Sequence, residues 1–269
     1  MYIGDLSSFG GVIRMPEHQE TVLKAPDERL EDLQLHGLQI LQKQSGFRFG
    51  MDAVLLADFA RIHANDRVAD FGTGTGILPF LLYGRNKGAL FEAFEVQEQM
   101  ADMARRSVQI NDLNHCMHIH AASVVLAPQI LGTACVDAVI CNPPYGISGK
   151  TLRNPSDELS VARHQNEEGL SPWFEAAARI LKPKGKFFMV YPASGMLEAM
   201  DGLRKWKLEP KHFRLVYPSA VKPANLALIE AVLYAKPMLH AEPPLIVYDV
   251  SGQPTQELDR IYHPGRENE

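Results

Sequence analysis

Long apolar segments are missing from this sequence. No run of about 18 apolar residues occurs in the 269-residue chain, although roughly that length is needed for a helix to cross a bilayer. The first 20 residues contain scattered acids and no apolar stretch behind a basic start, so they do not form a recognisable secretory signal. We therefore expect a soluble protein with no membrane partner.

Cysteine is also scarce. The chain contains three, Cys116, Cys135 and Cys141, and no two of them are spaced as Cys-x-x-Cys. An odd set at these spacings predicts neither a disulfide framework nor a zinc site. The sequence therefore indicates a cytoplasmic protein without a bound metal.

An excess of positive charge is missing as well. The 27 Lys and Arg residues against 32 Asp and Glu give a formal net charge of -5, which argues against a protein that holds nucleic acid by overall charge alone. The stretch from Arg204 to Lys222 departs from this balance, because its only acid is Glu209. Its cations are Arg204, Lys205, Lys207, Lys211, Arg214 and Lys222. They form either a solvated surface or a phosphate-binding patch.

The length and the apolar content of 46% are sufficient for one large domain with a modest extension. We expect a poorly ordered lead-in over residues 1–27, a main domain over 28–262 and a short tail over 263–269. Residues 29–59 are predicted to be helical in two pieces, separated near residues 45–50. No internal repeat or low-complexity tract occurs.

From residue 67 onward, short β-branched segments alternate with helical patterns, which is typical of βαβ units and a parallel sheet. The expected strands are 67–71, 89–96, 116–121, 136–141, 186–191, 211–217 and 226–234. The expected helices are 77–83, 99–111, 172–181 and a segment from Ser194, as its cap, to about Trp206. The pattern predicts an α/β fold with a seven-stranded, doubly wound, Rossmann-like sheet that ends in an antiparallel hairpin.

A glycine-rich loop follows the first of these strands and opens a helix. Its sequence is Asp70-Phe71-Gly72-Thr73-Gly74-Thr75-Gly76. Glycine permits the close approach of backbone to a ligand at this point of a βα unit. A dinucleotide fingerprint would place its third glycine where Ile77 stands, so the spacing favours S-adenosyl-L-methionine over NAD. The helix start would face the methionine carboxylate, and Asp70 would accept from the methionine ammonium.

Glu95 ends the next predicted strand. A carboxylate there is suited to accept both ribose hydroxyls of a nucleoside. Taken alone, Glu95 is equally consistent with a solvent-facing strand end, and the glycines alone with a tight turn. The order of strand, loop, helix, strand and acid favours a cofactor site.

The tetrad Asn142-Pro143-Pro144-Tyr145 lies at the carboxyl end of the fourth predicted strand, the edge at which open α/β sheets bind ligands. Two successive prolines fix φ and remove two donors, which makes a rigid corner rich in acceptors. In isolation the tetrad is equally consistent with a turn that ends a strand. Its position in the same sheet as the glycine loop favours a binding site.

Such a corner suits an amine substrate. An exocyclic NH2 is a weak nucleophile because its lone pair is delocalised into the ring. The side chain of Asn142 and the carbonyl of Pro143 can accept its two hydrogens and favour a more pyramidal nitrogen, and Tyr145 offers a flat face to an unstacked base. Catalysis of this kind depends on positioning more than on acid–base chemistry.

The glycine loop, Glu95 and the tetrad together resemble the class I, amino-directed methyltransferases. Further segments are similar to the bacterial tRNA(Val) adenine-37 N6-methyltransferase family: Glu31-Asp32-Leu33-Gln34, residues 46–57, Ala162-Arg163-His164 and residues 242–248. The resemblance runs from about residue 28 to 262. It implies N6-methylation of an adenine in tRNA next to the anticodon.

The resemblance also assigns roles to individual residues. The catalytic residues would be Asn142, Pro143, Pro144 and Tyr145. Cofactor contacts would come from Asp52, Asp70, Gly72, Thr73, Gly74, Gly76, Glu95, Val96, Ser123 and Asn142. Substrate contacts would come from Phe49, Arg163 and His164, and no residue would bind a metal.

One position departs from the family. Relatives usually carry an acid after the third strand to hold the adenine of the cofactor, whereas this chain has Ala121-Ala122-Ser123. Ser123 could supply only one weaker hydrogen bond. Alternatives therefore remain at this point: the same chemistry on a glutamine amide of a release factor, on rRNA or on DNA adenine, or an RNA-binding module of this fold without catalysis.

Overall fold

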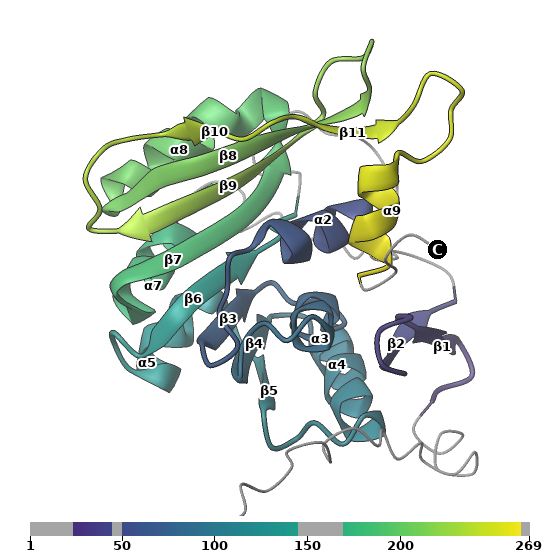
Figure 1. Ribbon diagram of the computed structural model, residues 1–269. Coiled ribbons are helices and arrows are strands. Elements are labelled where there is room, and N and C mark those ends of the chain that lie inside the picture. The colour runs from purple at the N-terminus through teal and green to yellow at the C-terminus, as the bar shows by residue number, and fades with distance from the viewer. Residues whose placement is uncertain (1–23, 45–49, 145–168, 265–269) are drawn as a thin grey trace, which may run out of the picture.

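The computed structural model describes residues 24–44, 50–144 and 169–264. A nine-stranded sheet forms its centre, and a separate two-stranded hairpin packs at its side (Figure 1). The strands of the main sheet are β3 (Arg67–Phe71), β4 (Leu90–Glu95), β5 (Met117–Ala121), β6 (Val136–Cys141), β7 (Leu181–Pro192), β8 (Leu208–Ser219), β9 (Leu226–Leu233), β10 (His240–Ala241) and β11 (Leu245–Tyr248).

The strand order across the sheet is β10-β8-β9-β7-β6-β3-β4-β5, with β11 also paired to β8. Strands β3 to β7 are mutually parallel, whereas β9 runs antiparallel between β7 and β8. The chain moves outward from β3 to β5 and then crosses back to β6 on the other side of β3. The expected doubly wound sheet with a terminal antiparallel hairpin is thus confirmed, and two short strands extend it beyond β8.

Helices cover both faces of the sheet. The helical segments are α2 (Met51–Phe59), α3 (Ile77–Gly84), α4 (Glu98–Ile110), η1 (Val124–Leu126), α5 (Ala127–Leu131), α7 (Ser171–Ile180), η3 (Ala193–Gly195), α8 (Met196–Lys205) and α9 (Gln256–Tyr262). Side chains of α2, α3, α4 and α9 form one buried apolar cluster, and those of α5, α7 and α8 form a second on the opposite face. No helix in the described part of the chain is long and apolar enough to cross a membrane.

The helical prediction for residues 29–59 was wrong in its first half. Only α2 is helical there, and the preceding residues form the antiparallel strands β1 (Glu28–Asp32) and β2 (Gln39–Lys43). Leu33, Leu35 and Leu38 lie in the connection between the two strands, and all three are buried there. Gln34 and His36 take left-handed backbone conformations in this turn, which a helix does not permit.

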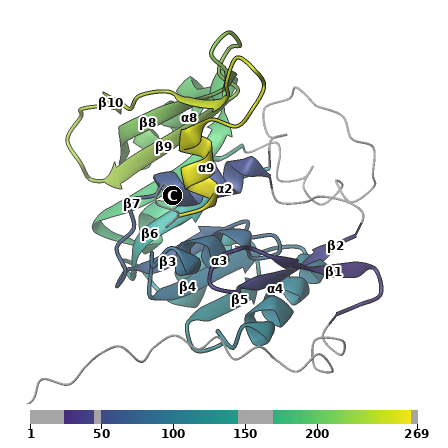
Figure 2. The same ribbon diagram turned by 45° about the vertical axis from the view of Figure 1, so that its right-hand side comes forward.

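The hairpin is anchored to α4, beside which it lies in Figure 2. Arg106 donates to both oxygens of Glu28 at 2.6 and 2.8 Å, and this pairing holds the pKa of Glu28 at about 2. The Leu41 amide donates to the Ser107 hydroxyl at 2.9 Å. Side chains of α4 thus form the hydrogen bonds and the ion pair that the hairpin needs. The local periodicity of the sequence does not reveal these contacts.

Two smaller predictions also differ. Ser194 does not cap α8, because it lies within the 3-10 turn η3, and Gly195 is the residue before the helix, with no side-chain cap. Strand β7 begins at Leu181, well before the predicted start, and Lys184 within it has a φ of 70°. Helix α9, which packs against α2, was not expected from the sequence.

Candidate functional site

The candidate site lies where the carboxyl ends of four parallel strands meet. In the sheet register, Phe71 of β3 pairs with Phe94 of β4 on one side and with Cys141 of β6 on the other. The glycine loop therefore begins next to the start of the tetrad at Asn142. The strand order reverses between β3 and β6, which is the point at which open α/β sheets bind ligands.

The glycine loop is held by backbone hydrogen bonds to the neighbouring strand. The amides of Gly72 and Thr73 both donate to the Phe94 carbonyl at 2.9 Å. The φ angles of Gly72, Gly74 and Gly76 are 72°, 58° and 93°, in the left-handed region that favours glycine. The loop conformation thus requires all three glycines before any ligand is considered.

The three glycines differ in what surrounds them. A Cβ on Gly72 would lie 2.9 Å from the Trp173 ring of α7, and a Cβ on Gly76 would lie 3.3 Å from the Phe80 ring. A Cβ on Gly74 would have no protein atom within 4 Å. Gly72 and Gly76 therefore permit packing within the protein, whereas Gly74 borders open space in which a ligand can lie.

Glu95 holds the glycine loop through hydrogen bonds to backbone amides. It is only 6% exposed, so a solvent-facing strand end is excluded. One carboxylate oxygen accepts from the Gly74 amide and the other from the Gln97 amide, both at 2.9 Å. Each oxygen retains a lone pair for a further donor. Glu95 therefore fixes the loop and can also accept from a hydroxyl of a ligand.

Asp70 is buried without a hydrogen-bond partner. Its residue is 1% exposed, and neither carboxylate oxygen nor the nearby Thr73 hydroxyl has a hydrogen-bond partner in the described structure. Burial raises the pKa of Asp70 to about 7, with the charge of Glu95 adding to the rise and Thr73 opposing it. A buried carboxylate without partners is costly, and a cationic or N–H donor from a ligand would relieve that cost.

The tetrad is partly described. Asn142 is half-buried, Pro143 is buried and Pro144 is exposed, so the corner lies at the boundary between core and surface. Tyr145 lies outside the described residues, as do the predicted substrate contacts Phe49, Arg163 and His164. Among the predicted cofactor contacts, Val96 is exposed and Ser123 is half-buried directly after β5.

Asp52 lies in the first turn of α2. Its side chain folds back over Gly50, where a Cβ would come within 2.5 Å of the carboxylate. At the other end of the helix, Lys87 donates to the carbonyls of Ala57, Asp58 and Ala60 at 2.7 to 2.9 Å. This contact with the last carbonyls fixes the orientation of the helix that carries Asp52.

Sequence reasoning missed two side chains that support the loop. Gln42 of β2, 1% exposed, donates to the Thr75 hydroxyl at 2.6 Å. Trp173 lies against Gly72 and packs edge-to-face on Phe71, with ring centroids 6.4 Å apart. Both come from elements distant in sequence, and no local pattern marks them.

The described residues contain no group of three His, Cys, Asp or Glu side chains that could hold a metal ion. The three cysteines form no disulfide with one another. The site is therefore built from glycines, two buried carboxylates and the Asn-Pro corner.

Curated relatives of this chain carry one recurring name. A tRNA1(Val) (adenine(37)-N6)-methyltransferase of Tolumonas auensis is 29% identical over 154 residues, which are 56% of this chain and 62% of the relative. A protein of the same name from Aliivibrio salmonicida is 24% identical over 219 residues, 81% of this chain and 90% of the relative. The matched region thus spans less than two thirds of the first relative.

Solved structures of low identity share the fold. A predicted O-methyltransferase from Agrobacterium tumefaciens aligns with a TM-score of 0.62 at 22% identity, covering 78% of this chain and 95% of that chain. TYW2 of Pyrococcus horikoshii, solved with MeSAdo, aligns with a TM-score of 0.52 at 14% identity, covering 78% and 73%. At this identity the likeness concerns the fold alone.

The family model described as the methyltransferase small domain matches residues 50–205, more than half of the chain. The matched range begins at the residue before α2, ends with α8, and includes the glycine loop, Glu95 and the tetrad. The chain therefore belongs to the methyltransferase small domain family.

Proposed function

We propose that this protein is an S-adenosyl-L-methionine-dependent methyltransferase that methylates N6 of an adenine in tRNA, next to the anticodon at position 37, in the cytoplasm. The observation that carries the proposal is the buried Asp70 carboxylate without a partner, beside a three-glycine loop at the switch point of the sheet. The resemblance of the flanking segments and the names of the relatives support tRNA as the acceptor.

The residues fit this cofactor. The oxygens of Asp70 have no partner and suit the methionine ammonium. The space beside Gly74 admits the ligand close to backbone, and the remaining lone pairs of Glu95 suit ribose hydroxyls. Ser123 can offer one hydrogen bond to the adenine ring. S-adenosyl-L-methionine supplies, when bound, a methyl group activated by a sulfonium.

The tetrad would hold the acceptor amine. The Asn142 side-chain oxygen and the Pro143 carbonyl would accept the two amino hydrogens, which weakens delocalisation of the nitrogen lone pair. The buried position of Pro143 keeps this acceptor away from bulk water, so its hydrogen bond is stronger than in solution. We assign stacking of the base to Tyr145 and contacts to RNA to Phe49, Arg163 and His164.

A labelling experiment tests the acceptor class. Purified protein is incubated with tritiated S-adenosyl-L-methionine and with unmodified tRNA, release factor or duplex DNA in separate reactions. We expect label in tRNA alone. Label that enters only the release factor would replace the proposed acceptor with a glutamine amide, and label in duplex DNA alone would replace it with DNA adenine.

A substitution in the tetrad tests the catalytic assignment. We expect Asn142→Ala to abolish methyl transfer while S-adenosylhomocysteine binds within a few fold of the unmodified protein. Asn114→Ala, at an exposed turn before β5, is the matched control and should change neither quantity. Equal loss of binding and transfer in Asn142→Ala would assign Asn142 to the cofactor instead of the acceptor.

A further inference from the structure

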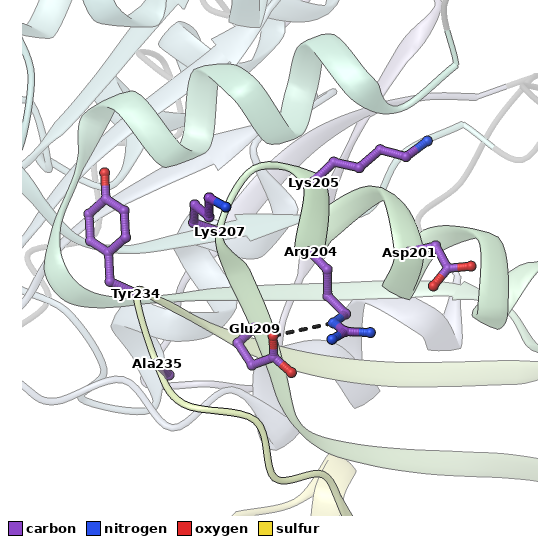
Figure 3. Close-up of a pocket in the computed structure, with 7 residues that line it drawn as sticks. All are labelled: Asp201, Arg204, Lys205, Lys207, Glu209, Tyr234 and Ala235. Atoms are coloured by element: carbon purple, nitrogen blue, oxygen red, sulfur yellow. Dashed lines mark hydrogen bonds and ion pairs between the residues drawn. The ribbon is translucent and has the colours of Figure 1, made fainter.

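A groove lies at the edge of the sheet opposite to the glycine loop. It consists of two adjoining hollows of about 750 and 540 Å³ that share Lys205, Lys207 and Tyr234. Figure 3 shows the residues that line the first hollow. Its walls come from the end of α8, the start of β8 and the turn after β9, with α7 beyond them. None of the predicted site residues that the structure describes lines it, so it is separate from the described part of the candidate cofactor site.

Strained backbone gathers around this groove. Ala134, Lys184, Lys207 and Tyr234 have φ angles of 50°, 70°, 63° and 56°, although none is glycine. They are four of the eight such residues in the described structure. Each conformation costs on the order of 1–3 kcal/mol, and such residues cluster at functional sites.

The strained residues hold one another in place. The Tyr234 amide donates to the Lys207 carbonyl at 2.9 Å, and the Lys184 ammonium donates to the Tyr234 carbonyl at 3.4 Å. The Tyr234 residue is 62% exposed, and its ring stands at the edge of the groove (Figure 3). The backbone of Tyr234 is therefore held in place while its aromatic ring stays exposed.

Free positive charge lies beside the ring. Arg204 pairs with Glu209 at 3.3 Å, whereas Lys205 and Lys207 are exposed and form no ion pair in the described structure. Among the residues that line the two hollows, the acids are Glu175, Asp201 and Glu209, against the four cations Arg179, Arg204, Lys205 and Lys207. Glu175 pairs with Arg179 and Glu209 with Arg204, so Lys205 and Lys207 are the lining cations without an ion pair in the described structure.

The groove is too far from the tetrad to contact the same nucleotide. Val232 pairs with Lys186, which pairs with Ala138, and Tyr234 lies two residues beyond Val232. Asn142 lies four residues beyond Ala138 in the opposite direction. Along the strand direction, Tyr234 and Asn142 are therefore six residues apart. At about 3.3 Å for each residue, this is a distance of roughly 20 Å. At one phosphate per about 3.4 Å of duplex, that is about six phosphates along one strand.

We propose that this groove binds a second part of the same tRNA, remote from the base that is methylated; the inference rests on the proposed function. The ammonium groups of Lys205 and Lys207 contact backbone phosphates, and an unpaired base stacks on the Tyr234 ring. Unpaired ammonium groups next to an aromatic face match the two chemical parts of an RNA strand, which favours RNA over an acidic peptide.

Kinetics with intact tRNA test the inference. We expect Lys205→Glu to raise KM for tRNA about fivefold with kcat unchanged, and to lower the slope of log KM against log salt by roughly 0.7–0.9. Lys24→Glu makes the same change of charge at an exposed residue that does not line the groove, and it should leave KM within twofold. Tyr234→Gly removes the ring and relieves the strained φ, so it should raise KM about fivefold without loss of thermal stability.

The outcomes separate this inference from the proposed function. Labelling of tRNA by the unmodified protein tests the function itself and does not depend on the groove. If the unmodified protein labels tRNA but Lys205→Glu and Tyr234→Gly show the KM of Lys24→Glu, the groove does not bind tRNA. A loss of kcat with KM unchanged would also overturn the inference, because a remote contact contributes to binding and not to the chemical step.

Discussion

If Asp70 holds the methionine ammonium as proposed, its buried carboxylate should make cofactor binding depend on pH. Its pKa is raised to about 7 by burial, so the protein without ligand carries a largely neutral carboxyl at pH 6. A methionine ammonium beside it would favour the charged form and lower that pKa. Binding then releases a proton, and the affinity must rise as pH increases through 7.

The magnitude follows from the fraction that is ionised. With a pKa of about 7, roughly one carboxyl in eleven is ionised at pH 6 and about three quarters at pH 7.5. S-adenosylhomocysteine should therefore bind about eightfold more tightly at pH 7.5 than at pH 6. Asp70→Asn should bind more weakly at pH 7.5, and its affinity should change with pH only as the amino group of the ligand titrates.

Isothermal titration in buffers of different ionisation enthalpy measures both the affinity and the released proton. The amino group of the ligand titrates in the same way with both proteins. Any difference between them in how affinity changes with pH is therefore caused by Asp70. An unchanged affinity of the unmodified protein between pH 6 and 7.5 would refute the placement of the ammonium at Asp70. An equal slope in Asp70→Asn would assign the proton to another group.

The same shift has a consequence for stability. The pKa of Asp70 is higher in the folded state than in the unfolded state, so the folded state is most stable at low pH, where Asp70 is neutral in both states. This stability decreases as pH rises and is lost by about pH 7, where Asp70 of the folded protein ionises. Without ligand, Asp70→Asn should therefore be more stable than the unmodified protein at pH 8 in urea unfolding, and the gap should narrow towards pH 5. A gap independent of pH would contradict the buried, unpaired state of Asp70.

Three further predictions concern the loop and the hairpin. Gly72→Ala and Gly74→Ala should each lose about 1–2 kcal/mol of unfolding free energy from their left-handed φ; Gly72→Ala should lose more because it displaces Trp173, and calorimetry decides the order. In ligand titrations Gly74→Ala should weaken S-adenosylhomocysteine binding at least tenfold, and a normal affinity would mean that the space beside Gly74 stays empty. The Glu28 pKa is lowered from 4.5 to about 2, so the ion pair contributes about 3 kcal/mol above pH 4.5 that is lost as pH falls through 2. The difference in stability between the unmodified protein and Glu28→Gln should accordingly shrink between pH 5 and pH 2 in acid unfolding, and a constant difference would exclude the lowered pKa.

The parts of the fold that were predictable are those in which local pattern and topology agree. Strands β3, β4 and β6 are short and largely buried, and the glycine loop and Glu95 follow directly from their positions at strand ends. Parallel order then brings the loop and Asn142 together. The assignment of these residues required only the order of elements along the chain.

The parts that were missed depend on contacts between distant segments. The β1–β2 hairpin is held by contacts with Arg106 and Ser107 of α4, which lies more than 60 residues further along the chain. The role of Gln42 follows from that hairpin. The left-handed conformation of Tyr234 is invisible in sequence, because tyrosine rarely adopts it and the surrounding turns impose it.

The structure separates the cations of the basic stretch from Arg204 to Lys222 into paired and unpaired ones. Two of its arginines are paired, Arg204 with Glu209 and Arg214 with Glu257. Lys205 and Lys207 remain free and exposed beside Tyr234. Whether a cation of this stretch can contact phosphate depends on whether an acid already pairs with it. The amino-acid composition does not show these ion pairs.

Nucleoside mass spectrometry of tRNA after reaction with the purified protein and S-adenosyl-L-methionine tests the central proposal most directly. We expect N6-methyladenosine at position 37 of one tRNA species, and we expect it to be absent when Asn142→Ala replaces the unmodified protein. Methylation confined to a ring nitrogen, to a ribose hydroxyl or to protein would contradict an amino-directed site built on Asn142 and Pro143.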